Sequence, residues 1–172
     1  MDEFTKVFEE ASADVEPGYF HLNIHGGDPV YRERVYCYEL YHQMRLRWPI
    51  NCSFWLNGEI DKAAHPILTG MGAGRAKPDF LVHSPGDMAG NYAIMEVKPE
   101  GAGNGDIRTD LDKLSLFTAA VGYRRAIYLV YGHHPDATME RIHAALAADA
   151  ERLGPIELWA HTAPGAQAFR YG

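Results

Sequence analysis

Cysteine is scarce in this chain, and its scarcity excludes two structural classes. The 172 residues include only Cys37 and Cys52. Two cysteines cannot supply the several bridges of a small disulfide-stabilised secreted protein, and they are too few for a structural zinc site. A reducing, cytoplasmic location therefore suits the composition best.

Long apolar runs and cationic side chains are also lacking. No apolar run approaches the roughly 20 residues that span a bilayer, and the N-terminus lacks a signal-peptide pattern, so we expect no membrane partner. Lysine and arginine number 16 against 23 aspartates and glutamates, which gives a formal net charge of -7. This balance argues against a general nucleic-acid binder, since such proteins are usually basic.

What the chain does contain is enough apolar material for a folded domain. Hydrophobic residues make up 47% of the sequence, and its length allows a substantial core. Repeats and low-complexity stretches are absent. We predict a single domain over residues 1–172, with a core at about 29–160, an N-terminal helix and arm over 1–28, and a tail over 161–172.

The most informative stretch, residues 77–98, has the pattern of a β-hairpin. We expect its strands at about 79–83 and 92–98. The second strand is mostly apolar on both faces, which predicts a central strand covered on both sides. Glu96 and Lys98 are the exceptions, because charged side chains are costly to bury without a partner.

The expected hairpin register gives Glu96 a carboxylate neighbour. With a loop over 84–91, antiparallel pairing sets residue 83 opposite 92, residue 81 opposite 94, and residue 79 opposite 96. Asp79 then lies beside Glu96 on one face. Two adjacent carboxylates repel each other, which raises a pKa, unless a divalent cation lies between them. Oxygen ligands suit Mg²⁺ or Mn²⁺, and Lys98 can reach the same place.

These residues also carry a family resemblance. Pro78-Asp79, followed by Glu96-Val97-Lys98 at the end of an apolar strand, resembles the PD-(D/E)XK nuclease superfamily, in an uncharacterised branch of it. The resemblance covers about residues 29–131 and implies the restriction-endonuclease-like fold. It also implies a metal-dependent hydrolase, an endonuclease that cleaves phosphodiester bonds, with DNA expected ahead of RNA.

The resemblance assigns roles to the residues of the motif. Asp79, Glu96 and the main-chain carbonyl of Val97 are expected to bind Mg²⁺, for which Mn²⁺ can substitute. Lys98 is expected to orient or activate the attacking water and to offset charge on the transition state.

A helix is predicted from Pro29 to about Arg47, with Asp28 as its N-cap. Glu39 lies on the border of its apolar face. In the resembling family an acidic residue on this helix often completes the metal shell through water. The resemblance therefore gives Glu39 an outer-shell metal role among the catalytic residues; a surface glutamate is the alternative.

Two further segments offer weaker candidates. A strand predicted over 52–63 carries Glu59 and Asp61 on one face. Either could approach the metal from the neighbouring strand, with Glu59 favoured; a polar strand end is the alternative. The glycine-rich loop over 69–76 carries Arg75 and leads to Lys77. We expect both cations to contact a nucleic-acid backbone.

A helix predicted over 106–121 follows the Glu96-Val97-Lys98 strand. Its Asp110 and Lys113 have the spacing of a plain intrahelical ion pair. The helix is also similar to one that packs over the active-site strand in one uncharacterised branch of the superfamily. Lys113 is a further candidate for contacting nucleic acid.

The order of the predicted elements gives the fold class. After the hairpin come the 106–121 helix, a strand over 125–131, a helix over 136–153 and a strand over 156–160. Such an order predicts an α/β protein whose mixed sheet is flanked by helices on both faces. It agrees with the αβββαβ core of the restriction-endonuclease-like fold.

Other functions remain open at the level of sequence. The chain is alternatively a non-catalytic or partner-dependent member of the fold that acts as a binding module. A small-molecule hydrolase or a toxin-like, partner-regulated protein would suit the acidic charge. A surface hairpin in which Glu96 and Lys98 merely pair with each other is the plainest alternative. A homodimer or a protein partner is compatible with each of them.

Overall fold

The computed structural model describes residues 3–59, 66–70, 74 and 76–172. These residues form an α/β structure with seven α-helices and a six-stranded mixed sheet. The helices are α1 (Glu3–Ala13), α2 (Pro17–Phe20), α3 (Glu33–Arg47), α4 (Pro66–Gly70), α5 (Asn104–Ala119), α6 (Asp136–Ala148) and α7 (Ala150–Leu153). The strands are β1 (Trp55–Gly58), β2 (Phe80–His83), β3 (Asn91–Pro99), β4 (Arg125–Tyr131), β5 (Glu157–His161) and β6 (Phe169–Arg170).

The strands lie side by side in the order of the sequence, from β1 to β6. The pairs β1–β2 and β2–β3 are antiparallel, β3–β4 and β4–β5 are parallel, and β6 is an antiparallel edge strand. Parallel neighbours need a crossover connection. Here α5 connects β3 to β4, and α6 with α7 connects β4 to β5.

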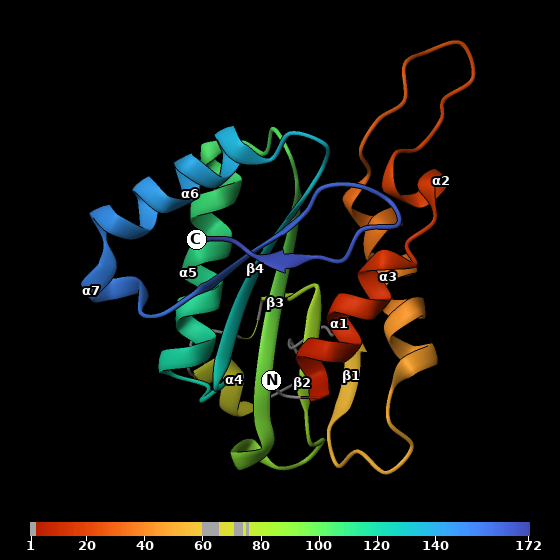
Figure 1. Ribbon diagram of the computed structural model, residues 1–172. Coiled ribbons are helices and arrows are strands. Elements are labelled where there is room, and N and C mark those ends of the chain that lie inside the picture. Colours follow the sequence, from red (N-terminus) through yellow and green to blue (C-terminus); the bar gives the residue numbers. More distant parts are fainter. Residues whose placement is uncertain (1–2, 60–65, 71–73, 75) are drawn as a thin grey trace.

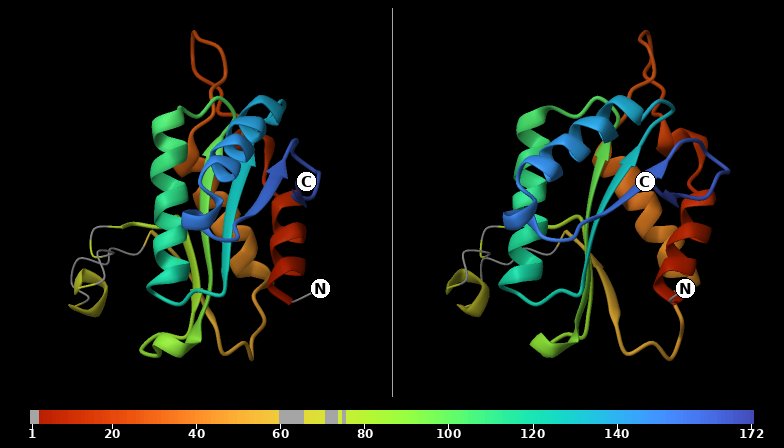
Figure 2. Two further views of the ribbon diagram at one scale, coloured as in Figure 1. Left: turned by 90° about the vertical axis from the view of Figure 1, so that its left-hand side faces the viewer. Right: turned by 60° about the vertical axis from the view of Figure 1, so that its left-hand side comes forward.

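Helices cover both faces of the sheet, as predicted. In Figures 1 and 2, α1 and α3 lie on one face, and α5, α6 and α7 lie on the other. Met95 and Val97 of β3 belong to the core with Phe8 of α1, whereas Ile94 belongs to the core with Leu111 of α5. The prediction that this strand is central and covered on both sides is therefore confirmed.

The hairpin register is confirmed in part. Leu81 lies opposite Ile94, as predicted, but His83 pairs with Asn91 and not with Tyr92. The cause is a register shift between Val82 and His83, where one strand accommodates an extra residue as a bulge does.

The start of α3 was predicted too early. The helix begins at Glu33, after Arg32 in an extended conformation. The main-chain groups of Val30 are bonded to Leu22 at 2.9 Å in both directions, so this backbone forms a bridge and cannot be helical. Asp28 is consequently not the N-cap. The segment between α2 and α3 projects from the rest of the structure (Figure 1).

Other boundaries differ more modestly. The strand predicted over 52–63 is the shorter β1, and its positions 60–63 lie outside the described residues. The single helix predicted over 136–153 is interrupted at Asp149, which separates α6 from α7. The predicted tail contributes β6. No helix among the described residues is both long and apolar enough to cross a membrane.

Candidate functional site

Asp79 is fixed to the edge of β3 through its side chain. Its Oδ2 accepts a hydrogen bond from the main-chain N–H of Val97 at 2.8 Å. The register of β2 and β3, extended by two residues, sets Pro78 opposite Val97. Proline has no N–H to donate, and the N–H and C=O of one residue point toward the same neighbouring strand. The carbonyl of Val97 therefore points toward the Asp79 side and receives no ladder bond from Pro78.

Glu96 is the most deeply buried acidic residue of the site, with 1% of its surface exposed. Its Oε2 accepts a hydrogen bond from Lys113 Nζ at 2.7 Å. Its Oε1 is buried and has no hydrogen-bond partner within the described part of the chain. Burial, reinforced by the negative charge of Asp79, raises the pKa of Glu96 well above its usual value. A proton or a cation at this carboxylate would therefore be stabilising.

Burial also raises the pKa of Asp79, to about 6. The hydrogen bond from Val97 opposes this effect, the charge of Glu33 adds to it, and the charge of Lys98 opposes it. Asp79 is therefore a carboxylate whose ionised form is only partly compensated by the protein near neutral pH.

Two lysines link the site to α3 and α5. Lys98 Nζ lies 2.8 Å from Glu33 Oε2 and 3.2 Å from Asp110 Oδ2. Lys113 Nζ lies 3.2 Å from Asp110 Oδ1, so Asp110 bridges both ammonium groups. Burial by itself lowers the pKa of Lys98, but the hydrogen bond to Glu33 and the nearby carboxylates outweigh it, so the pKa is raised. Lys98 is thus an ammonium ion at neutral pH.

These contacts define the charged cluster. It comprises Glu33 at the start of α3, Asp79 before β2, Glu96 and Lys98 on β3, and Asp110 and Lys113 on α5. When every group is ionised, the four carboxylates exceed the two ammonium groups by two negative charges. Glu96 and Lys98 do not pair with each other; Glu96 pairs with Lys113, and Lys98 pairs with Glu33 and Asp110.

The cluster fits a divalent cation in its charge and in its available oxygens. No three His, Cys, Asp or Glu side chains come together to hold a metal within the ranges that the structure describes. Two carboxylates and one main-chain carbonyl are nevertheless an acceptable oxygen set for a hard cation that keeps part of its water. The unpartnered Oε1 of Glu96 and the two excess negative charges are the observations that favour this fit.

A cavity of about 430 Å³ adjoins Asp79 on the α3 side. Its lining includes Tyr38 and Tyr41 of α3 and Asn57 of β1. A ligand in this cavity would reach Asp79 without displacing the apolar core.

Glu39 and Glu59, selected from the sequence, do not join the cluster through their side chains. Glu39 lies on α3, six residues beyond Glu33, and its Oε1 accepts a hydrogen bond from Gln43 Nε2 at 2.7 Å. The main-chain N–H of Glu59 donates to the Asp79 carbonyl at 3.1 Å. Its carboxylate, however, is paired with exposed Arg34 at 3.1 Å.

The sequence-selected cations are placed differently from one another. Lys113 faces the carboxylates of the cluster, at 2.7 Å from Glu96. Lys77 is exposed, two residues before Asp79. Arg75 lies outside the described residues, so its predicted contact with nucleic acid stays a prediction.

Two members of the cluster were missed as site residues by the sequence analysis. Asp110 falls within the buried stripe of α5, between Ile107 and Leu114. A charged residue in an apolar stripe needs a partner, so this position could have indicated a site residue. The sequence signal for Glu33 is weaker. An acidic residue is favourable in the first turn of a helix, but Glu33 occupies that position only because α3 begins four residues later than predicted.

No family model, curated protein or solved structure matches this chain. The candidate site therefore rests on its own geometry and chemistry.

Proposed function

We propose that this chain is a metal-dependent nuclease that hydrolyses phosphodiester bonds at the charged cluster, with DNA as the expected substrate. The observation that carries the proposal is the buried, unpartnered Oε1 of Glu96, which lies under the electrostatic influence of the Asp79 carboxylate. Asp79, Glu96 and the carbonyl of Val97 would hold Mg²⁺ or Mn²⁺. Such binding would give Oε1 a partner and compensate both carboxylates.

The arrangement of elements supports the proposal. Apart from the short helix α4 between β1 and β2, the elements α3, β1, β2, β3, α5 and β4 follow one another in the order αβββαβ, and their strands are neighbours in the sheet. This is the element order of the restriction-endonuclease-like core. Within it, the two candidate metal-binding carboxylates lie where β2 begins and near the end of β3.

In the proposed hydrolysis, the divalent cation and Lys98 have different roles. A bound divalent cation lowers the pKa of a coordinated water and polarises a phosphodiester oxygen. Because the pKa of Lys98 is raised, this residue would act as a positive charge and hydrogen-bond donor and not as a proton acceptor. It would orient the attacking water and offset the negative charge that develops on the phosphate. Glu33 and Asp110 hold its Nζ in place.

The charge of the cluster also sets an order of binding. When its four carboxylates are ionised, the cluster carries two excess negative charges and repels a phosphate group until a cation is bound. We therefore expect nucleic acid to engage Asp79 and Glu96 only in the presence of the divalent ion.

A cleavage assay tests the proposal. Wild type, Glu96→Gln and the exposed-site control Glu140→Gln are purified identically. Each is incubated with plasmid DNA, single-stranded DNA and RNA in Mg²⁺, Mn²⁺ or EDTA. We expect wild type and Glu140→Gln to cleave in the presence of metal, and Glu96→Gln to be inactive. Cleavage by Glu96→Gln at the wild-type rate would contradict the proposal.

One observation favours a non-catalytic or partner-dependent member of the same fold. Lys98 and Lys113 are both engaged by carboxylates, so the two lysines already compensate part of the negative charge of the cluster. Calorimetric titration with Mg²⁺ and Mn²⁺ separates the two functions. Metal binding without cleavage would favour a partner-dependent enzyme, whereas no binding would favour a purely structural or binding role.

A further inference from the structure

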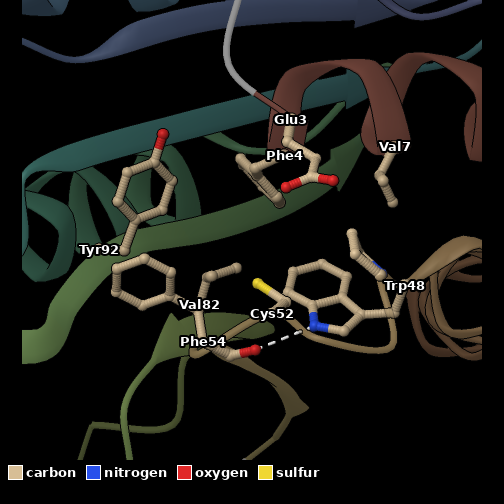
Figure 3. Close-up of a pocket in the computed structure, with 9 residues that line it drawn as sticks. Glu3, Phe4, Val7, Trp48, Cys52, Phe54, Val82 and Tyr92 are labelled. Atoms are coloured by element: carbon tan, nitrogen blue, oxygen red, sulfur yellow. Dashed lines mark hydrogen bonds between the residues drawn. The ribbon is translucent and has the colours of Figure 1, made fainter.

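A second pocket, apart from the charged cluster, lies between α1, the segment after α3, and strands β2 and β3 (Figure 3). Its volume is about 220 Å³. Four of the residues that line it are aromatic, and we call them the aromatic cage: Phe4, Trp48, Phe54 and Tyr92. A cavity of about 150 Å³ is already large enough for a benzene-sized ligand, so this pocket can admit a small organic group.

Phe4 meets two other rings of the cage edge to face, and a third pair of rings is tilted. The Phe4 centroid lies 6.3 Å from that of Trp48 at an interplanar angle of 64°, and 6.1 Å from that of Tyr92 at 85°. Phe54 lies 5.1 Å from Tyr92 at 38°. The four rings, which line the pocket, therefore do not form one flat stack.

The aromatic cage presents mainly ring faces to a ligand, and few hydrogen-bond donors. Trp48 Nε1 donates to the main-chain carbonyl of Phe54 at 2.9 Å, so the indole N–H is already used and the ring is held in position. Ring faces are negative and attract cations. Phe4 already makes such a contact elsewhere, since the guanidinium carbon of Arg125 lies 5.5 Å from its centroid.

A carboxylate stands beside the cage. Glu3, in the first turn of α1, lines the same pocket, and Figure 3 draws it with Phe4 and Trp48 among the lining residues. Glu3 is exposed and forms no ion pair within the described residues. A cation bound among the rings would thus gain a negative charge at the edge of the pocket, on a chain that is acidic overall.

We propose that the aromatic cage and Glu3 bind a small organic cation that carries a methylated ammonium group. A primary ammonium is compact and strongly hydrated, and it would find few acceptors here. A quaternary ammonium presents apolar methyl groups to the rings while its diffuse charge interacts with their faces and with Glu3. This binding site is independent of the proposed nuclease function.

Calorimetric titration of the 172-residue chain tests the inference with a matched pair of probes. Choline carries a trimethylammonium group, and 3,3-dimethylbutan-1-ol has the same shape without the charge. We expect choline to bind about tenfold more tightly than the neutral probe. Glu3→Gln should weaken choline and leave the neutral probe unchanged. Trp48→Leu should weaken both, and Trp55→Leu, at an exposed tryptophan outside the cage, should weaken neither.

Two results would overturn the inference. Equal affinity for the two probes in wild type would show a merely apolar pocket, and no detectable choline binding would show no ligand site. If Trp48→Leu fails to fold, the exposed Glu3→Gln variant tests the inference by itself, because it must lower the affinity for choline and leave that for the neutral probe unchanged. Upfield shifts of the choline methyl resonance in wild type would confirm placement among the rings.

Discussion

The carboxylate of Asp79 accepts a hydrogen bond from the main-chain N–H of Val97 at 2.8 Å. In doing so it replaces a β-ladder bond, because β2 begins only at Phe80. The carboxylate is thereby held beside the central strand β3, where burial raises its pKa to about 6. This single relationship links the end of a strand to the electrostatics of the candidate site.

Asp79→Asn should stabilise the metal-free chain at neutral pH. The amide can still accept the Val97 N–H but carries no charge to bury. We expect the free energy of unfolding to rise by about 1 to 2 kcal/mol, measured by urea denaturation in EDTA. The same variant should lose the stabilisation that Mg²⁺ gives to wild type. Identical responses of the two proteins to Mg²⁺ would exclude a metal site at Asp79.

The stability of the metal-free chain should depend on pH through Asp79. Its pKa is about 6 in the folded chain against an ordinary value of 3.8. Between about pH 4 and 6 the folded state therefore binds more protons than the unfolded state. The contribution of Asp79 to the free energy of unfolding falls as pH rises through this window.

The difference in stability between wild type and Asp79→Asn isolates that contribution, because other groups titrate alike in both. Wild type should lose stability relative to the variant as pH rises from about 4 to 6, and Mg²⁺ should restore it above pH 6. A difference that is constant over this range would contradict the raised pKa.

Lys98→Ala should abolish most cleavage while the chain stays folded. The loss should be at least about 10²-fold, since the ammonium acts on charge that develops in the transition state. Mg²⁺ binding should persist or tighten, because a positive charge is removed. Activity and calorimetry are compared with Lys6→Ala, at an exposed lysine of α1. Unaltered cleavage by Lys98→Ala would remove this residue from the mechanism.

Lys113→Met tests whether Lys113 neutralises the charge of Glu96 when no metal ion is bound. Without it, both oxygens of a buried carboxylate lack a partner, so the metal-free chain should lose on the order of 2 kcal/mol. Mg²⁺ should bind roughly tenfold more tightly, because a competing charge has gone. Thermal melting with and without Mg²⁺ measures both effects. A weaker response to Mg²⁺ than in wild type would speak against this role.

Glu33→Gln and Glu39→Gln together decide which helix carboxylate serves the site. Glu33 bonds to Lys98 at 2.8 Å, whereas Glu39 is bonded by Gln43. We expect Glu33→Gln to lower cleavage about tenfold by loosening Lys98, and Glu39→Gln to have a smaller effect. The reverse order would restore Glu39 as the residue that completes the metal shell.

Local sequence patterns were sufficient for much of the architecture. A run that is mostly apolar on both faces placed the central strand of the hairpin. The pairing of Leu81 with Ile94 was predicted because turn position and side-chain period fix the register. The strand from Arg125 to Tyr131 was predicted at its observed bounds. From that register alone, Asp79 could be placed beside Glu96.

Only the tertiary structure decided which charges meet. Glu33 reaches Lys98 across 65 positions of sequence, and its place depends on a helix start that the Leu22–Val30 bridge sets. The packing of α5 turned Lys113 toward Glu96. Such contacts depend on how helices dock on a sheet, which side-chain periodicity within one element does not specify. The sequence therefore determined the strand that carries Glu96, and the fold determined the cations and carboxylates that surround it.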